Sequence, residues 1–428
     1  MRSILLVIPF LLFHLLGQSQ DTCSVCGKQP VKNWSANYAQ SLQPLLSIAD
    51  TSANTVQLDL DFHQNSNSIN TVFAGAFLSK NNISPAMKNR VLQFAGDRIL
   101  YEDELKTGLA YRHFFKKQKL SIYASYYHRN MRQLNAGRDA FRLVFGGNKY
   151  FEDKTVDLSQ THFQNLMYNQ YAVGLSGTVS NWNLGVNFSF LQGFSNQQLR
   201  TNKASLYTAP QGEYLDATYQ YEFRQSNTGA SHYFDGNGYG FSGDVHIQYK
   251  TERGQWSFDA NDIGFIYWQK SPTSYRGDSA IRFEGLVIDD ITKIGQGLSV
   301  DSLLKNFLPR TSHSGYSILL PFQLQLVYSK PVALKNNNAM VVNLGINTRN
   351  IYKYYAYGYV KLNFILQKKW LISTSAGYGG YSNFNIGFEV AKKSKWVDVA
   401  LGTTNLIGDL VPMYYPGSSV YLRAMAKF

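Results

Sequence analysis

The last ten residues of the chain alternate between two sets of side chains and stop on an aromatic residue. Side chains on a strand point alternately to its two faces, so every second residue shares a face. A soluble protein must protect the free edge of a terminal strand, whereas a closed barrel has no free edge. The segment therefore predicts the closing strand of a barrel. Its apolar face carries Val420, Leu422, Ala424, Ala426 and Phe428, and its more polar face carries Ser419, Tyr421, Arg423, Met425 and Lys427.

The same period-two pattern recurs at hairpin spacing along the chain, which indicates antiparallel strands that are apolar on one face only. Together the candidates predict a barrel of about 14 strands, with about 16 as the alternative, because bacterial barrels have even strand numbers. The clearest candidate strands are residues 120–127, 184–190, 244–249, 256–261, 340–349, 354–366, 371–378, 384–391 and 397–402.

The connections between these strands are of two kinds. Five are short, at residues 116–119, 180–183, 251–254, 367–369 and 392–395. Four are long, at residues 128–169, 223–238, 269–315 and 403–417. If the C-terminus is periplasmic, all the short connections lie in the periplasm and all the long ones outside, as in outer-membrane barrels. The predicted fold is an all-β, transmembrane antiparallel β-barrel in the cell outer membrane, with short periplasmic turns and long extracellular loops.

The first residues predict export. Arg2 precedes an apolar run over residues 4–16, and small residues follow at Gly17 and Ser19. Such a run is typical of a secretory signal and is shorter than the roughly 20 residues of a membrane-spanning helix. A buried first helix is the alternative. We expect a signal peptide at residues 1–19, an N-terminal periplasmic or lumenal segment at 20–54, and the barrel at 55–428.

Composition agrees with a barrel. Aromatic residues make up 15% of the chain and charged residues 16%, with a mean hydropathy of −0.26, whereas a helical membrane protein would be more apolar. The net charge of +13 comes without a nucleic-acid-binding motif. We expect contact with outer-membrane lipids and none with nucleic acid. Cations gather in the predicted periplasmic turns, at Lys116, Lys117, Lys119, Lys368, Lys369, Lys392, Lys393 and Lys395.

Four segments, at residues 145–161, 189–208, 254–268 (GQWSFDANDIGFIYW) and 400–428, resemble a family of uncharacterised Bacteroidota outer-membrane β-barrel proteins. That family is distantly similar to FadL-type transporters and to the PorV and PorQ barrels of type IX secretion. The resemblance extends over residues 105–428. It implies the barrel fold, and it implies that the strand ending at Phe428 contacts the barrel-assembly machinery.

The resemblance implies two classes of function. The first is passive transport of a hydrophobic or small solute. The alternative is a scaffold or secretion-associated barrel that binds a protein partner. An enzyme is not expected, because the chain has scattered histidines and neither a G-x-S-x-G motif nor a paired-carboxylate signature.

Two cysteines close to the expected mature N-terminus, Cys23 and Cys26, form a C-x-x-C pair that we interpret as a short disulfide in an oxidising compartment. No His follows the pair as in haem attachment, and no second ligand pair has zinc spacing, so neither a metal nor a cofactor is expected.

Other polar residues fall on the expected inner face of strands. Asp244, His246, Asp259 and Arg423 are therefore candidate lumen-facing binding residues, although polar side chains are the usual lining of a barrel.

The long connection at residues 269–315 is locally acidic but lacks the spacing of a calcium loop, so a solvated loop is expected. Within it, Ser299 can cap a short amphipathic helix that lies across the barrel mouth or only stabilises its own loop. The apolar face of that helix carries Val300, Leu303, Leu304 and Phe307, and the acidic residues are Asp278, Glu284, Asp289, Asp290 and Asp301.

Overall fold

The computed structural model describes residues 54–226, 236–284, 310–334, 338–367 and 369–428. The predicted signal peptide, Cys23, Cys26 and the predicted helix that begins at Ser299 lie outside these residues. Among the described residues, no helix is long and apolar enough to cross a membrane.

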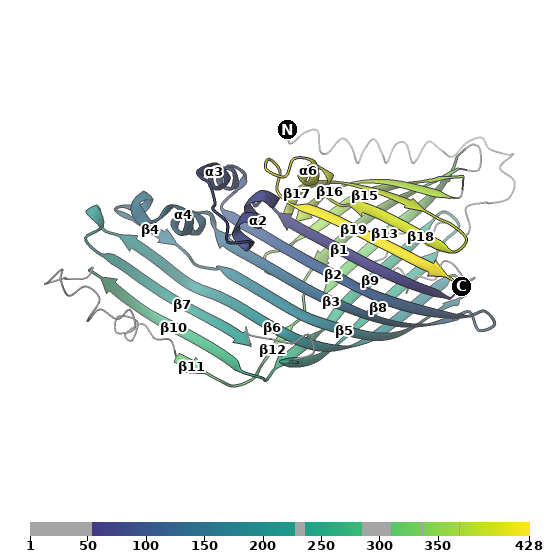
Figure 1. The fold of residues 1–428 in the computed structure, drawn as a ribbon, viewed down its shortest axis with the longest axis horizontal. Coiled ribbons are helices and arrows are strands. Elements are labelled where there is room, and N and C mark those ends of the chain that lie inside the picture. The colour runs from purple at the N-terminus through teal and green to yellow at the C-terminus, as the bar shows by residue number, and fades with distance from the viewer. Residues whose placement is uncertain (1–53, 227–235, 285–309, 335–337, 368) are drawn as a thin grey trace.

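The described strands form a closed antiparallel barrel of 14 strands, so the predicted fold class is confirmed (Figure 1). The ring closes where the first strand pairs with the last, from Thr55 opposite Lys427 to Gln64 opposite Ser418. The terminal segment singled out by its alternation is therefore the closing strand. In order round the wall the strands are β1 (Thr55–Ser66), β2 (Arg98–Phe115), β3 (Leu120–Gly137), β5 (His162–Val179), β6 (Trp182–Thr208), β8 (Gly238–Lys250), β9 (Gln255–Trp268), β12 (Tyr316–Leu319) continued by β13 (Gln323–Ala333), β14 (Ala339–Arg349), β15 (Tyr355–Leu366), β16 (Trp370–Gly380), β17 (Ser382–Lys392), β18 (Val397–Thr403) and β19 (Ser418–Lys427).

The outer face of the wall is apolar and exposed, whereas the alternate, inward positions are polar and buried. In a bilayer every backbone polar group must be paired, which a closed ring of strands achieves. A closed barrel with this exterior is an outer-membrane protein, as the sequence predicts. Outward side chains that show the pattern are Leu58, Leu60, Leu109, Val173, Leu175, Val186, Phe188, Ile263, Phe265, Ile346, Leu401 and Val420.

The short turns, the start of β1 and the end of β19 lie at one mouth of the barrel, and the long connections lie at the other mouth. This is the predicted asymmetry. Four boundaries of the expected long connections were wrong. Strand β3 continues to Gly137, β5 already begins at His162, and β7 (Leu215–Ser226) extends into the expected loop at 223–238. These strand ends extend beyond the segments in which apolar and polar residues alternate cleanly, so the sequence pattern did not extend the strands over them.

The expected loop at residues 269–315 also begins as a strand. β10 (Pro272–Phe283) pairs along its whole length with β7, and β7 pairs with the upper part of the 27-residue strand β6. Asp278 therefore lies on a strand. With β4 (Lys154–Asp157) and β11 (Arg310–Ser312), these strands form an extracellular sheet that continues the barrel wall outward (Figure 1).

Helices cover the extracellular end near β1, β2 and β3. Asn70 caps α2 (Thr71–Leu78) by accepting a hydrogen bond from Phe73 N, and Ser84 caps α3 (Pro85–Phe94), where proline suits the first turn. Their apolar sides pack with α4 (Arg138–Gly146) around Phe73, Val91 and Phe141. The remaining short elements are η1 (Asn148–Phe151), η2 (Pro210–Gly212) and α6 (Leu406–Leu410).

The wall is irregular on both sides of β9. On one side, Pro321 separates β12 from β13, since proline has no N–H for the ladder. On the other side, the β8–β9 register shifts between Gly243 and Val245 of β8, and Asp262 of β9 has a φ of 61°. Such a bulge re-aims side chains at the irregular position. Here it directs Asp262 toward the lumen, where it meets Arg129.

Candidate functional site

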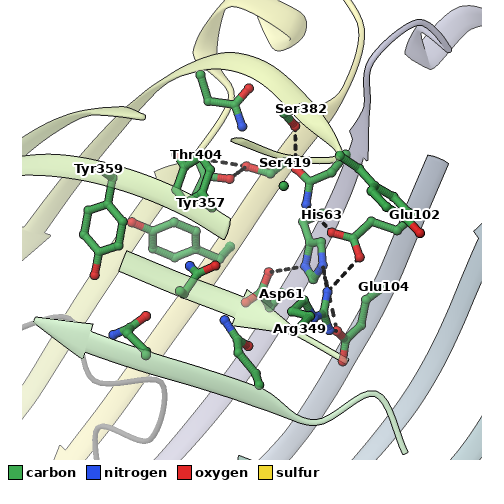
Figure 2. Close-up of a pocket in the computed structure, with 18 of the residues that line it drawn as sticks. Asp61, His63, Glu102, Glu104, Arg349, Tyr357, Tyr359, Ser382, Thr404 and Ser419 are labelled. Atoms are coloured by element: carbon green, nitrogen blue, oxygen red, sulfur yellow. Dashed lines mark hydrogen bonds and ion pairs between the residues drawn. The ribbon is translucent and has the colours of Figure 1, made fainter. Parts of the chain in front are cut away.

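A cavity of ≈ 330 Å³ occupies the extracellular half of the lumen, on the side of β1, β2 and β13–β19 (Figure 2). Its lining is polar and aromatic. Inward positions of β15 contribute Tyr357 and Tyr359, and β1 contributes Asp61 and His63. In Figure 2 these two pairs of side chains lie on opposite sides of the cavity. The cavity is therefore suited to a small molecule that makes hydrogen bonds.

One border of the cavity is a network of ion pairs that crosses the lumen. Arg349 on β14 contacts Glu102 Oε2 at 3.1 Å and Glu104 Oε2 at 2.9 Å. Both glutamates belong to β2, which lies on the opposite side of the 14-stranded ring from β14. Glu104 also accepts hydrogen bonds from Arg129 on β3, and Arg129 reaches Asp262 on β9 at 2.7 Å. Side-chain contacts thus join opposite walls of the barrel.

These charges are almost fully withdrawn from water. The exposed fractions of the side chains are 8% for Arg349, 3% for Glu102 and 5% for Glu104. Buried charges are tolerated only when opposite charges and hydrogen bonds compensate them. Each carboxylate here has such a partner, and Glu102 also accepts a hydrogen bond from Asn65 at 2.8 Å. The cross-lumen network therefore spans this part of the lumen with buried charges that compensate one another.

A second bridge lies at the extracellular mouth. The rings of His162 and Tyr352 are stacked with centroids 5.5 Å apart, and Lys353 Nζ donates to Gln160 Oε1 at 2.9 Å. The β14–β15 turn thus contacts the start of β5. The barrel is divided into two lobes, and only one of them holds the cavity described above.

The other lobe contains an apolar cluster. Trp268, Ile266 and Leu191 have no exposed surface, and they pack with side chains from β3, β5 and β12. This cluster packs apolar side chains of five strands against one another inside the barrel. Its members are Met131, Leu166, Tyr168, Leu191, Ile266, Trp268, Tyr316, Ile318 and Leu320.

Three of the four residues predicted as lumen-facing come together on β8 and β9. His246 Nδ1 lies 2.6 Å from Asp259 Oδ1, and Asp244 accepts hydrogen bonds from Asn187 Nδ2 and from the backbone N–H of Asp262. Asp244, His246 and Asp259 are at most 1% exposed, and they are not among the residues that line the cavity. Their side-chain contacts join β6 to β8 and β8 to β9 on the inner face of the barrel.

The fourth predicted residue, Arg423, lines the cavity on β19 and lies apart from that cluster. It donates from Nε to Asp59 on β1 at 2.9 Å. The lumen-facing residues that sequence reasoning missed are Asp61 and the network residues. A signal was present, because in residues 56–63 the apolar positions alternate with Gln57, Asp59, Asp61 and His63.

Metal binding finds no support in the described part of the chain, where no group of three or more His, Cys, Asp or Glu side chains could hold an ion. The chemistry of the cavity is therefore that of hydrogen bonds, fixed charges and tyrosine rings.

Several solved barrels share a general likeness with this chain. The Pseudomonas putida toluene transporter TodX is 8% identical, with 91% of each chain covered and a TM-score of 0.40. The Ralstonia pickettii toluene transporter TbuX is 9% identical, with 91% of this chain and 92% of that chain covered and a TM-score of 0.43. A Pseudomonas aeruginosa FadL homologue is 8% identical, with 90% and 91% covered and a TM-score of 0.40. A likeness of this extent says nothing of what this barrel carries.

No curated protein matches the chain. A family model does match it, over residues 53–404, which is most of the 428 residues. The chain therefore belongs to the "Family of unknown function (DUF5723)".

Proposed function

We propose that this barrel carries small polar solutes across the outer membrane by passive transport. The observation that supports the proposal most directly is the polar cavity of ≈ 330 Å³ inside a closed transmembrane barrel. Binding sites for small molecules have volumes of roughly 300–1,000 Å³ and a few placed polar groups. A small hydrated solute suits this lining better than a hydrophobic one, because carboxylates, amides and guanidinium groups would lose water against an apolar molecule.

Water can reach several of the side chains that line the cavity. The side chain of Asp61 is 48% exposed and that of Arg423 is 40% exposed. Neighbouring network residues such as Glu104 are only 5% exposed. The lumen thus combines a wet cavity with a closure made of paired side chains. Passage requires that the closure rearrange, so transport is slow in the resting barrel.

Liposome swelling and single-channel conductance of the purified barrel test this proposal. The wild type should show small conductance steps and slow swelling with small polar solutes. Arg349→Ala removes the side chain that spans the lumen, so conductance should rise. A matched control is Arg282→Ala, which removes an arginine of the extracellular sheet. If neither wild type nor Arg349→Ala conducts or swells, the transport proposal is wrong.

A protein-binding scaffold is the second candidate, and the extracellular helices favour it. Val144 on α4 and Tyr150 on η1 are 73% and 72% exposed, and Phe77 on α2 is 56% exposed. Exposed apolar patches of this kind mark binding surfaces. The predicted similarity to PorV and PorQ, which remains a prediction, fits a secretion partner. If so, a protein should purify in stoichiometric amount with the barrel and be lost in a Val144→Glu variant.

A further inference from the structure

Within the cavity, two charges of opposite sign remain open to a ligand. Asp61 on β1 and Arg423 on β19 have the exposed side-chain fractions of 48% and 40% given above. The register pairs Asp61 with Tyr421 and Asp59 with Arg423, so Asp61 and Arg423 are diagonal neighbours on adjacent strands. The Cα atoms of diagonal neighbours are roughly 7–8 Å apart. The side chains of Asp61 and Arg423 can therefore contact two charged groups of one small molecule that lies between them.

Asp61 has only a weak partner. The Nδ1 atom of His63 on the same strand lies 3.9 Å from the Asp61 carboxylate, which is beyond hydrogen-bond distance, and His63 is a cation only when it is protonated. Lys106 lies directly opposite Asp61 in the β1–β2 register, yet its ammonium lies 4.3 Å from the centre of the Tyr127 ring. The carboxylate of Asp61 can therefore accept a ligand cation.

Arg423 is only partly used by the protein. Its ion pair with Asp59 involves Nε, and a guanidinium has five N–H donors. The exposed remainder can donate to a ligand carboxylate in the bidentate geometry that arginine favours. By contrast, Lys361 and Glu389 on the same side of the cavity are paired at 3.1 Å and are 10% and 13% exposed.

Tyrosines form the facing side of the cavity. The rings of Tyr357 and Tyr359 are stacked with centroids 5.8 Å apart, and both line the cavity across from Asp61 (Figure 2). A tyrosine ring offers an apolar face together with a hydroxyl group. A ligand held by its charges at Asp61 and Arg423 would place its uncharged part toward these rings.

We propose that Asp61 and Arg423 form a binding subsite for a small zwitterion of the α-amino-acid type. The ligand ammonium binds Asp61, the ligand carboxylate binds Arg423, and the side chain lies toward Tyr357 and Tyr359. This subsite deepens the proposed function and rests on it, because it names the class of solute that the cavity selects.

The test is titration calorimetry of the purified barrel with three matched probes: L-phenylalanine, N-acetyl-L-phenylalanine and L-phenylalaninamide. The first has both charges, and each of the others lacks one. The wild type should bind L-phenylalanine about tenfold more tightly than either blocked probe, as expected when a charged hydrogen bond is lost. Equal binding of the three probes, or no binding, would overturn the subsite.

Variants separate recognition from folding. Asp61→Asn should reduce the affinity for L-phenylalanine about tenfold and leave that for N-acetyl-L-phenylalanine unchanged. Asp61→Lys should reverse the preference, so that the N-acetyl probe binds more tightly than L-phenylalanine, a gain that misfolding cannot produce. Asp278→Asn on the extracellular sheet is the matched control and should behave as wild type. If Asp61→Lys shows no reversal, the assignment of Asp61 is wrong.

Swelling assays with the same barrel distinguish this inference from the proposed function. If glycerol and L-phenylalanine enter liposomes equally fast in wild type and in Asp61→Asn, transport stands and the subsite is refuted. If L-phenylalanine binds but no solute enters, including in Arg349→Ala, transport is refuted and the subsite stands as a binding site.

Discussion

Replacing Arg349 by Met should destabilise the barrel, because it breaks the cross-lumen network while keeping a side chain of similar length. Arg349 is the cation that pairs with Glu102, whereas Glu104 keeps its contact with Arg129 at 2.5 Å. One buried carboxylate thus loses its charge partner and retains only the hydrogen bond from Asn65. Breaking a buried pair by removing one partner costs about 3–5 kcal/mol. We expect about 3 kcal/mol, since only one of the two glutamates is left uncompensated.

The free energy of unfolding can be measured by urea denaturation of the folded barrel in detergent, followed by tryptophan fluorescence. The double variant Arg349→Met with Glu102→Gln should recover most of the loss, because the unpaired charge is then absent. Arg282→Met is the control. Its partner Asp216 and Arg282 itself are 38% and 51% exposed, and water screens an exposed pair so that it adds little to stability. A loss for Arg349→Met no larger than that of the control would refute the closed, desolvated network.

Three further outcomes follow from the structure. Deleting Phe428 removes two 3.0 Å backbone hydrogen bonds with Asn54 at the barrel seam, so the folded, heat-modifiable fraction in outer membranes should fall, and normal insertion would contradict this. Trp268→Ala should lower the free energy of unfolding by about 3–5 kcal/mol, because the indole is fully buried, and a loss below about 1 kcal/mol would count against the apolar lobe. The hydrogen bond from Arg282 lowers the pKa of Asp216 in the folded protein below its ordinary value of 3.8. The contribution of this pair to the stability of the sheet is therefore fully present above that value, and it is lost as the pH falls through the pKa of Asp216 in the folded protein. The protection of β7 and β10 amides against hydrogen exchange, relative to the intrinsic rate at the same pH, should therefore fall below about pH 4 in wild type but not in Arg282→Met.

The sequence was sufficient for features that depend on local alternation. Residues 184–190 alternate between apolar and polar, and the structure exposes Val186 and Phe188 while it buries Asn187 and Ser189. Backbone geometry alone dictates that such neighbours face opposite sides. The same reasoning failed at strand ends such as His162, where a strand extends beyond the bilayer and neither face needs to be apolar.

The candidate site was only partly accessible from the sequence. Arg423 could be placed on the inner face because its strand alternates cleanly, and Asp61 could have been placed in the same way. That Arg423 meets Asp59 depends on ring closure, which brings together residues from the two ends of the barrel. Asp244, His246 and Asp259 are buried on β8 and β9 and do not line the cavity.

The sequence by itself determined the strand pattern, the loop asymmetry and the apolar exterior, because each follows from a period of two residues and from the properties of the bilayer. Only the tertiary structure decided that Arg349 meets Glu102 and Glu104 across the lumen, and that one lobe contains an apolar cluster while the other holds a polar cavity. The physical reason is that contacts across a barrel depend on its cross-section, on the stagger of its strands and on the bulge at Asp262. A local pattern records which face a residue occupies, but not which residue lies opposite it across the lumen.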